Sequence, residues 1–439
     1  MRIAVVGAGP AGFYAAGLLL DAGFAVDVFE RLPTPWGLVR LGVAPDHPKI
    51  KSVSRVFEEI AGRAGFRFLG NVEVGRDVTH HELTLHYDGV LYAVGARADR
   101  RLGVAGEDLP GSLSARAFVG WYNGDPDQAA LGPDLAVDRV VVVGNGNVAL
   151  DVARMLTLDP RAIEATDVAD HALAALEGSA VKEVVVLGRR GPAEASFTNP
   201  ELRELGDLDG VRVVVDADDL DVTMPTEANA RRNVETLRTW AGETAPARRT
   251  IRLRFLRSPV AILGDRGVEA VETVRNTLEP RADGSVAAVA TRERETIRCG
   301  LVLTSIGYRG EPIDGVPFDG RSGTIPNEKG RVAAGLYCAG WIKRGPSGVI
   351  GTNRKDAGET VDCLLADAGF GKLPGPLATS PRGIDALLAA RGVGVVDGGG
   401  WARIDAAERA RGEEAGRPRV KLCTWSALLD TAAGAGARR

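Results

Sequence analysis

The most informative residues for chemistry in this chain are two adjacent arginines and one glutamate. Arg189 and Arg190 follow the apolar run 183–188, which reads as a strand, and Glu30 follows a similar run at 24–29. A carboxylate at such a strand end accepts hydrogen bonds from ribose hydroxyls, whereas two guanidinium groups attract and grip a 2′-phosphate. The chain therefore carries the signs of two different nucleotide sites, the second of them favouring a phosphorylated dinucleotide.

A glycine-rich turn between a predicted strand and a predicted helix precedes each of these groups. The turns are Gly7-Ala8-Gly9-Pro10-Ala11-Gly12 and Gly144-Asn145-Gly146-Asn147-Val148-Ala149. Glycines let a pyrophosphate approach the backbone, and the N-terminus of the following helix supplies partial positive charge. Glu30 follows its turn at about the usual 20-residue spacing. An insertion at 158–182 places Arg189 much further from the second turn, so spacing alone would favour a purely structural turn there. The arginine pair favours a nucleotide site instead, and its alternative interpretation is a solvated pair at a strand end.

These groups require an α/β fold to position them. The hydrophobic pattern predicts strands at 3–6, 24–29, 87–95, 139–143 and 183–188, with helices at 10–22, 52–64 and from the second turn to about 156. Residues 33–51 are too proline-rich for a regular element, 251–304 are β-rich, and 336–340 return to the first unit. Residues 398–400, three glycines, are expected in a loop. We expect two dinucleotide-binding, Rossmann-like domains, the second inserted into the first.

The composition is typical of a soluble globular protein. Its 439 residues are 45% apolar and carry a formal net charge of −4, which argues against general nucleic-acid binding. No apolar run is long enough for a membrane span, and the first strand begins at Arg2, so we expect neither anchor nor leader peptide. Cys299, Cys338, Cys363 and Cys423 form no metal-like cluster and no Cys-x-x-Cys pair. Buried, inert thiols in a cytoplasmic protein without a metal are expected.

Five longer segments resemble the adrenodoxin-reductase-type ferredoxin–NADP⁺ reductases, in particular the bacterial NADPH–ferredoxin reductases, over nearly the whole chain. They are Thr34-Pro-Trp-Gly-Leu-Val-Arg40, Gly42-Val-Ala-Pro-Asp-His-Pro-Lys-Ile-Lys51, Gly144-Asn-Gly-Asn-Val-Ala-Leu-Asp-Val-Ala-Arg154, Gly188-Arg-Arg-Gly-Pro192 and Gly340-Trp-Ile-Lys-Arg-Gly-Pro-Ser-Gly-Val-Ile-Gly-Thr-Asn353.

The resemblance implies FAD in the domain formed by 1–104 and 306–439, and NADP(H) in the domain 105–305. NADPH would give a hydride to FAD, which passes electrons singly to an iron–sulfur ferredoxin. The implied FAD site comprises Gly7, Gly9, Pro10, Ala11, Gly12, Glu30, Leu38, Val74, Arg100, Trp341, Gly348, Val349 and Ile350. The implied NADP site comprises Asn145, Gly146, Asn147, Val148, Arg189, Arg190 and Glu201, with Gly348 near the nicotinamide.

The resemblance also implies candidate catalytic residues beside the cofactors, namely His47, Asp151 and Trp341. His47 and Asp151 are expected to form a polar pair beside the cofactors, and Trp341 to lie beside the flavin with a ring to stack and an N–H to donate. Residues alone leave alternatives: a loop histidine bonded to its own turn, a core tryptophan, and for Glu201 a carboxylate that stabilises a helix N-terminus. Hydride transfer between cofactors needs no protein acid.

Residues 231–257 hold eight arginines, among them Arg231, Arg232 and Arg238, and only two glutamates. A basic surface there would steer an acidic ferredoxin, although a solvated face is the alternative. Other functions also stay open: a diaphorase or quinone-type reductase, or a flavin redox sensor without catalysis. The isolated cysteines argue against a flavin disulfide reductase. Monomer is the state that the resemblance implies.

Overall fold

The chain folds into two compact units. In the computed structural model the described residues are 1–439 except 243–245, 283, 349, 377–382 and 435–439. Unit 1 comprises Met1–Asp99 and Gly307–Arg439, and unit 2 comprises Arg100–Ile306, so the second unit is inserted into the first. The expected domains ended at 104/105 and 305/306, a few residues from these divisions, and the assignment of one nucleotide to each unit stays a prediction.

Unit 1 is built on a six-stranded sheet in which all neighbours run parallel except the first pair. Its strands, in spatial order, are β16 (Arg331–Ala333), β17 (Leu336–Cys338), β4 (Gly89–Tyr92), β1 (Arg2–Val6), β2 (Ala25–Glu30) and β3 (Phe66–Gly70). The predicted return of 336–340 is confirmed, because β17 pairs with β4. Two short strands, β5 (Ala98–Asp99) and β15 (Tyr308–Arg309), form a separate antiparallel pair.

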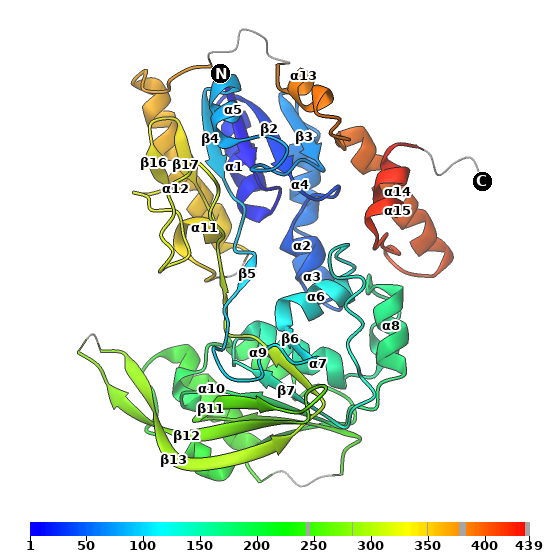
Figure 1. The fold of residues 1–439 in the computed structure, drawn as a ribbon, viewed down its shortest axis with the longest axis vertical. Coiled ribbons are helices and arrows are strands. Elements are labelled where there is room, and N and C mark those ends of the chain that lie inside the picture. Colours follow the sequence, from blue (N-terminus) through cyan, green and yellow to red (C-terminus); the bar gives the residue numbers. More distant parts are fainter. Residues whose placement is uncertain (243–245, 283, 349, 377–382, 435–439) are drawn as a thin grey trace. The chain divides into compact units, whose positions relative to one another are not determined.

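Both faces of this sheet are buried, as alternating side chains show. Ile3 and Val5 belong to one apolar cluster, together with residues of helices α1 (Pro10–Asp21), α4 (Ser54–Ala61) and α12 (Thr352–Gly369). Ala4 and Val6 belong to the other, with residues of α5 (His80–His86), α11 (Trp341–Arg344) and α13 (Gly383–Ala390). The alternation follows from the two-residue period of a strand. In Figure 1, α12 lies beside β16 and β17, which it contacts.

Two local predictions in unit 1 are wrong, and one predicted helix is present with shorter bounds. The segment 33–51 contains two helical turns, α2 (Leu38–Leu41) and α3 (Pro48–Lys51), the second begun by a proline, which suits a first helical position. The helix expected at 52–64 is the shorter α4. Residues 398–400 open helix α14 (Gly398–Glu414), because the Asp397 carboxylate accepts a hydrogen bond from the Gly400 N–H at 2.8 Å and caps the helix. Helix α15 (Trp425–Ala432) packs against α14.

Unit 2 has its own six-stranded sheet, entirely parallel, as expected for a Rossmann-type fold. Its strands in spatial order are β6 (Ser112–Ser114), β14 (Leu301–Thr304), β7 (Arg139–Val143), β8 (Glu183–Leu187), β10 (Arg249–Arg254) and β9 (Val211–Val215). Its helices are α6 (Ala115–Asn123), α7 (Asn147–Thr157), α8 (Asp170–Glu177), α9 (Asn199–Glu204) and α10 (Ala228–Thr239), with 3-10 turns η1 (Pro160–Ala162), η2 (Pro192–Glu194) and η3 (Ala217–Leu220).

An antiparallel sheet of three strands covers part of the unit 2 core (Figure 1). It consists of β11 (Arg257–Leu263), β12 (Ala270–Pro280) and β13 (Val286–Arg298). Ile262, Val271 and Ile297 from these strands share one apolar cluster with Val141 and Val185 of the parallel sheet. The predicted β-rich region at 251–304 is therefore confirmed. Within the described ranges, no helix combines the length and apolar character that crossing a lipid bilayer requires.

Candidate functional site

The first glycine turn has the geometry of a phosphate-binding loop. Gly7 has φ +107°, and a Cβ there would lie 2.4 Å from the Ala93 carbonyl oxygen. A Cβ on Gly12 would lie 2.0 Å from the Gly7 carbonyl oxygen, so this position needs glycine for the close packing of α1 on the turn. Gly9, in contrast, has no atom within 4 Å of an added Cβ. No neighbouring atom therefore requires glycine at position 9. The backbone there faces open space, where a pyrophosphate would approach it.

Glu30 lies directly against this turn. Its carboxylate accepts a hydrogen bond from the Ala8 N–H at 2.9 Å and another from the Leu32 N–H at 3.1 Å. The Gly7 N–H donates to the Phe29 carbonyl at 2.8 Å, which joins the turn to the end of β2. The tertiary structure thus brings Glu30 and the turn together, as the sequence predicted, in the position where a carboxylate meets a ribose.

Trp36 and Gly37 also contact the turn, and sequence reasoning gave them no site role. The Trp36 N–H donates to the Ala8 carbonyl at 2.8 Å, and Trp36 has a φ of +81° that is rare for a bulky residue. A Cβ on Gly37 would lie 3.1 Å from the Gly9 Cα. The proline-rich composition of 33–37 could have signalled this rigid turn, but not that it lies beside Gly9.

The segment 340–353 reaches the N-terminal end of α1. Gly340 has φ +76°, and a Cβ there would lie 2.7 Å from the Ala11 Cβ. The Gly340 N–H donates to the Asp356 carboxylate. Lys343, nearly buried, lies 3.2 Å from Asp356 and 2.6 Å from Glu359, and its hydrogen bond lowers the pKa of Glu359. These contacts join the segment to the first turns of α12.

Trp341 is half-buried, and its indole is engaged by its own loop. The ring stacks on Tyr308 with centroids 6.0 Å apart, and Nε1 donates to the Ser347 carbonyl at 3.2 Å. A Cβ on Gly348 would lie 2.7 Å from the Thr352 Oγ1, so Gly348 is also required by its own turn. Val349 lies outside the described residues, and Ile350 packs against the α1–α12 core. Trp341 therefore organises the loop that precedes α12.

The second glycine turn repeats the geometry of the first. Gly144 has φ +120°, a Cβ there would lie 2.0 Å from the Ser305 carbonyl oxygen, and its N–H donates to the Leu187 carbonyl at 2.8 Å. Gly146, like Gly9, has no atom within 4 Å of an added Cβ. Since two turns of unlike sequence share this pattern of crowded and open positions, the long insertion does not alter the loop itself.

The other residues of this turn hold the segment that follows β8. A Cβ on Gly188 would lie 2.5 Å from the Asn145 Nδ2, so the Asn145 amide lies against the strand end. Asn147 accepts a hydrogen bond from the Thr198 N–H at 2.8 Å, just before α9. Val148 is half-buried in the first turn of α7, which begins at Asn147.

Arg189 and Arg190 have fixed backbones and available side chains. The Arg189 carbonyl accepts from the Asn276 Nδ2 at 2.7 Å, and the Arg190 carbonyl accepts from the Leu256 N–H at 3.0 Å. With the residues that the structure describes, neither guanidinium forms an ion pair. Arg189 is exposed and Arg190 half-buried. Two unneutralised cations held at the end of β8 are suited to a 2′-phosphate. Asn276 is a supporting residue that no sequence signal indicated.

The remaining predicted residues are distributed over both units. In unit 1, Leu38 is 44% exposed on α2, Val74 is half-buried, and His47 precedes α3 with its N–H donating to the Ala44 carbonyl at 3.1 Å. In unit 2 are Arg100, exposed at the first position, Glu201 in the first turn of α9, and Asp151 on α7, which pairs with Arg154 at 2.7 Å. The pairing of His47 with Asp151 stays a prediction, because the two residues belong to different units.

Acids from distant strands neutralise much of the arginine run at 231–257. Arg252 pairs with Glu183 at 2.8 Å, and Arg254 pairs with Glu295 at 2.9 Å. Arg249 donates to the Leu158 carbonyl at 2.7 Å, and Arg238 donates to the Val222 carbonyl at 3.1 Å. These arginines therefore contribute less free positive charge than a count along the chain suggests, and the docking of a ferredoxin on the basic region stays a prediction. Arg231 and Arg232 are exposed on α10, as their helical spacing predicted.

The four cysteines are unpaired by disulfides, but only two are buried as expected. Burial raises the pKa of Cys299 and of Cys338 to about 12 each, so both are poor nucleophiles. Cys363 and Cys423 are partly exposed. The spacing of these two residues, without a neighbouring cysteine, offers no redox-active pair.

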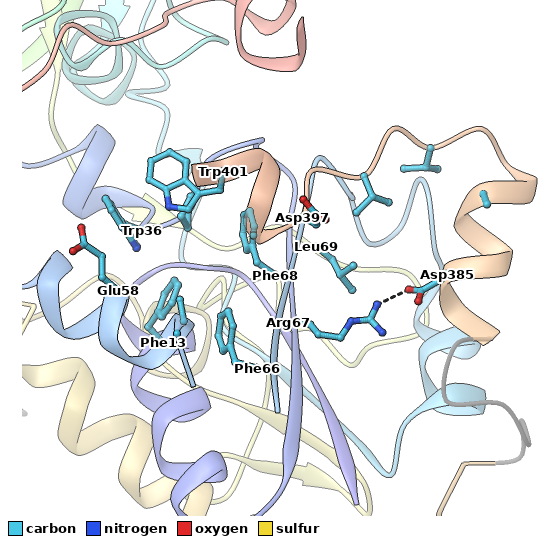
Figure 2. A pocket seen from close by; sticks show the side chains of 17 residues that line it. Phe13, Trp36, Glu58, Phe66, Arg67, Phe68, Leu69, Asp385, Asp397 and Trp401 are labelled. Carbon is cyan, nitrogen blue, oxygen red and sulfur yellow. Dashed lines mark hydrogen bonds and ion pairs between the residues drawn. The ribbon is translucent and has the colours of Figure 1, made fainter. Parts of the chain in front are cut away.

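A cavity of about 870 Å³ lies in unit 1 beside strand β3, and its lining combines aromatic, aliphatic and charged side chains. Figure 2 shows Phe13, Phe66 and Phe68 on one part of its wall and Trp36 and Trp401 on another. None of the predicted nucleotide-binding residues lines it. The cavity is thus separate from the glycine turn, although Trp36 belongs to the walls of both.

Comparisons with known proteins agree with this geometry. Residues 1–190 match the family described as pyridine nucleotide-disulphide oxidoreductase. NADPH-ferredoxin reductase FprA of Mycobacterium tuberculosis is 51% identical over 97% of this chain and 98% of its own. The mitochondrial NADPH:adrenodoxin oxidoreductase of Salvelinus fontinalis is 44% identical over 98% of this chain and 91% of its own. The solved structure of Mycobacterium tuberculosis FprA in complex with NADPH superimposes with a TM-score of 0.95 over 99% of both chains, at 51% identity.

Proposed function

The chain belongs to the family of NADPH-ferredoxin reductases and NADPH:adrenodoxin oxidoreductases, and we propose on this premise that it is an FAD-containing NADPH–ferredoxin oxidoreductase. The observation that carries the proposal is that the two glycine turns lie near side chains of opposite charge. One turn has Glu30 against it, and the strand after the other ends in two arginines without an ionic partner among the described residues. A carboxylate suits an unphosphorylated ribose and a cationic pair suits a 2′-phosphate, so the two sites take different dinucleotides.

We assign FAD to unit 1 and NADP(H) to unit 2. The open positions at Gly9 and Gly146 fit the approach of a pyrophosphate, and the helices α1 and α7 begin at these turns, so that their N-terminal N–H groups meet the negative charge. When bound, FAD accepts a hydride from NADPH and passes electrons one at a time to the iron–sulfur cluster of a ferredoxin. The chain's own residues hold and orient the two cofactors.

We assign the segment 340–353 to the flavin side of this arrangement. The N-terminus of α12 supplies partial positive charge, which favours the negative charge of a reduced flavin. Trp341 and Gly348 shape the loop before this helix, and we assign them, with Val349 and Ile350, to the flavin site. The ion pair between Lys343 and Asp356 stabilises the loop by joining it to α12.

We assign His47 and Asp151 to the polar surroundings of the cofactors, where they position groups rather than transfer a proton. Leu38, Val74 and Arg100 are assigned to FAD, and Glu201 to NADP(H). Family membership supports these roles, and the half-exposed positions of His47, Asp151 and Glu201 are compatible with them.

An iron–sulfur ferredoxin is the expected partner. We propose that it contacts α10 through Arg231 and Arg232, with Arg238 in the same helix, since exposed arginines attract an acidic surface. The reductase is expected to act as a monomer in the cytoplasm. Size-exclusion chromatography with light scattering tests the first of these expectations.

Anaerobic reduction followed by electron transfer tests the function directly. The purified protein should contain FAD, NADPH should bleach the flavin absorbance faster than NADH, and a ferredoxin should accelerate cytochrome c reduction in a salt-dependent manner. A protein that bleaches with NADPH but reduces quinones without any effect of ferredoxin would be a diaphorase. A protein that is not reduced by NADPH would be a binding protein or sensor.

A further inference from the structure

The C-terminal segment 398–432 encloses the chain segment 31–41 within unit 1. The Trp401 ring meets the Trp36 ring edge-on at 5.0 Å between centroids, as the labelled side chains in Figure 2 show. The Arg40 guanidinium lies 5.5 Å from the Trp401 ring centroid, and the Arg31 guanidinium lies 5.9 Å from that of Trp425. Both ends and the middle of 31–41 are thus held by residues far along the chain.

Glu408 is the centre of these contacts and is fully buried. Its carboxylate accepts two hydrogen bonds from Arg40, at 2.9 and 2.5 Å, and one from Arg419 at 3.0 Å. The Leu422 N–H also donates to it at 2.9 Å, and Lys421 donates to the Arg40 carbonyl at 3.2 Å. Burial alone would raise the pKa of Glu408, but Arg40 and Arg419 outweigh it and lower the pKa, so the group is a buried anion.

The other end of the same turn touches the first glycine loop. Trp36 and Gly37 meet Ala8 and Gly9 through the hydrogen bond and the close approach described above. Arg40 lies on α2, three residues after Gly37, and its side chain is buried on the C-terminal segment. Leu38, on the same helical turn, is exposed. The short segment 36–41 is therefore fixed on one side by Glu408, and on another side it contacts the predicted FAD loop.

We propose that Glu408 is a positioning residue for FAD: by fixing Arg40 it holds the turn 36–41 against Gly9, so that the C-terminal segment sets the affinity of unit 1 for the flavin. This inference rests on the proposed function, since it requires that FAD binds at the first glycine turn. Removing the Glu408 charge would leave the buried guanidinium group of Arg40 without this counter-charge, which favours displacement of the turn.

The test compares Glu408→Gln with a matched control, Asp367→Asn. Asp367 is also a buried acid of unit 1, and it accepts from Arg331 at 2.7 and 2.9 Å and from the Tyr337 hydroxyl at 2.8 Å. Both variants lose one buried negative charge, but among the described residues no contact links Asp367 to the turn 36–41. The dissociation constant of FAD is measured by titrating apoprotein, together with the urea midpoint of each apoprotein.

Glu408→Gln should raise the FAD dissociation constant at least about ten-fold, equivalent to about 1.4 kcal/mol, and should change the visible circular dichroism of the bound flavin. Asp367→Asn should lower the urea midpoint with less than about a two-fold change in FAD affinity. Equal losses of affinity in both variants, or no loss in Glu408→Gln, would overturn the proposal. A wild-type protein that binds no FAD would instead overturn the proposed function.

Arg40→Lys covers the case in which Glu408→Gln does not fold. Lysine keeps the positive charge but cannot make the two-pronged contact with Glu408. It should raise the FAD dissociation constant at least about three-fold, and about equally in the presence of 1 M salt, because the contact is buried. Unchanged affinity in a folded Arg40→Lys protein would refute the positioning role.

Discussion

Replacing Arg189 and Arg190 together by glutamine should remove the preference for NADPH over NADH. Their backbones are held by Asn276 and Leu256, so the substitution should leave β8 and the second glycine turn in place. A hydrogen bond to a charged group contributes about 1.5–3 kcal/mol. Because Arg189 is exposed, we take the lower value for each, about 3 kcal/mol together.

That loss corresponds to a rise of about a hundred-fold in the NADPH dissociation constant, with NADH little changed. Stopped-flow flavin reduction at varied coenzyme concentration measures both constants. Arg231→Gln/Arg232→Gln is the control, because it removes the same charge from exposed positions of the same unit. If the control lowers NADPH affinity as much as the Arg189/Arg190 variant does, general electrostatics and not a specific phosphate contact explains the selectivity.

Three further perturbations test two other residues of the site and one ion pair that stabilises unit 1. Gly9→Ala should leave apoprotein stability within about 0.5 kcal/mol but abolish FAD retention on gel filtration, whereas Gly12→Ala, whose Cβ would lie 2.0 Å from the Gly7 carbonyl oxygen, should lower the urea midpoint. His47→Gln should slow flavin reduction by NADPH at unchanged FAD content, and an unaltered stopped-flow rate would remove His47 from the mechanism. The hydrogen bond from Arg391 lowers the pKa of Glu82 from 4.5 to about 2, so its stabilising contribution is complete above pH 4.5 and disappears toward pH 2. The difference in melting temperature between wild type and Glu82→Gln should therefore shrink over that interval.

Local pattern was sufficient to predict both glycine turns, by spacing for the first and by the arginine pair for the second. Glu30 follows β2 and Arg189 follows β8, and in parallel sheets the carboxyl ends of adjacent strands meet at one edge. The pattern of strand, glycine turn and helix therefore predicts that each group lies beside its turn. The resemblance to a family added Leu38, Val74 and Trp341 as predicted site residues, which no local pattern indicates.

Charge counted along the chain was a poor guide to the surface. Arg252 and Arg254 alternate with buried apolar residues on β10, so Arg252 meets Glu183 of the adjacent strand β8 and Arg254 meets Glu295 of β13 in the antiparallel sheet. Sheet order, and not sequence distance, decides which charges meet. The same reason explains why Asn276 could not be foreseen as a support of Arg189.

The amino-acid sequence by itself determined the two glycine turns and the groups of opposite charge that end the strands beside them, because these features depend on residues within one strand–turn–helix unit. Tertiary structure alone decided what holds those turns in place. Glu408 and Arg40 are 368 positions apart, and only the packing of the C-terminal helices buries both charges together. No local pattern encodes such a pair, since its stability comes from the exclusion of water by elements that meet only in the folded chain.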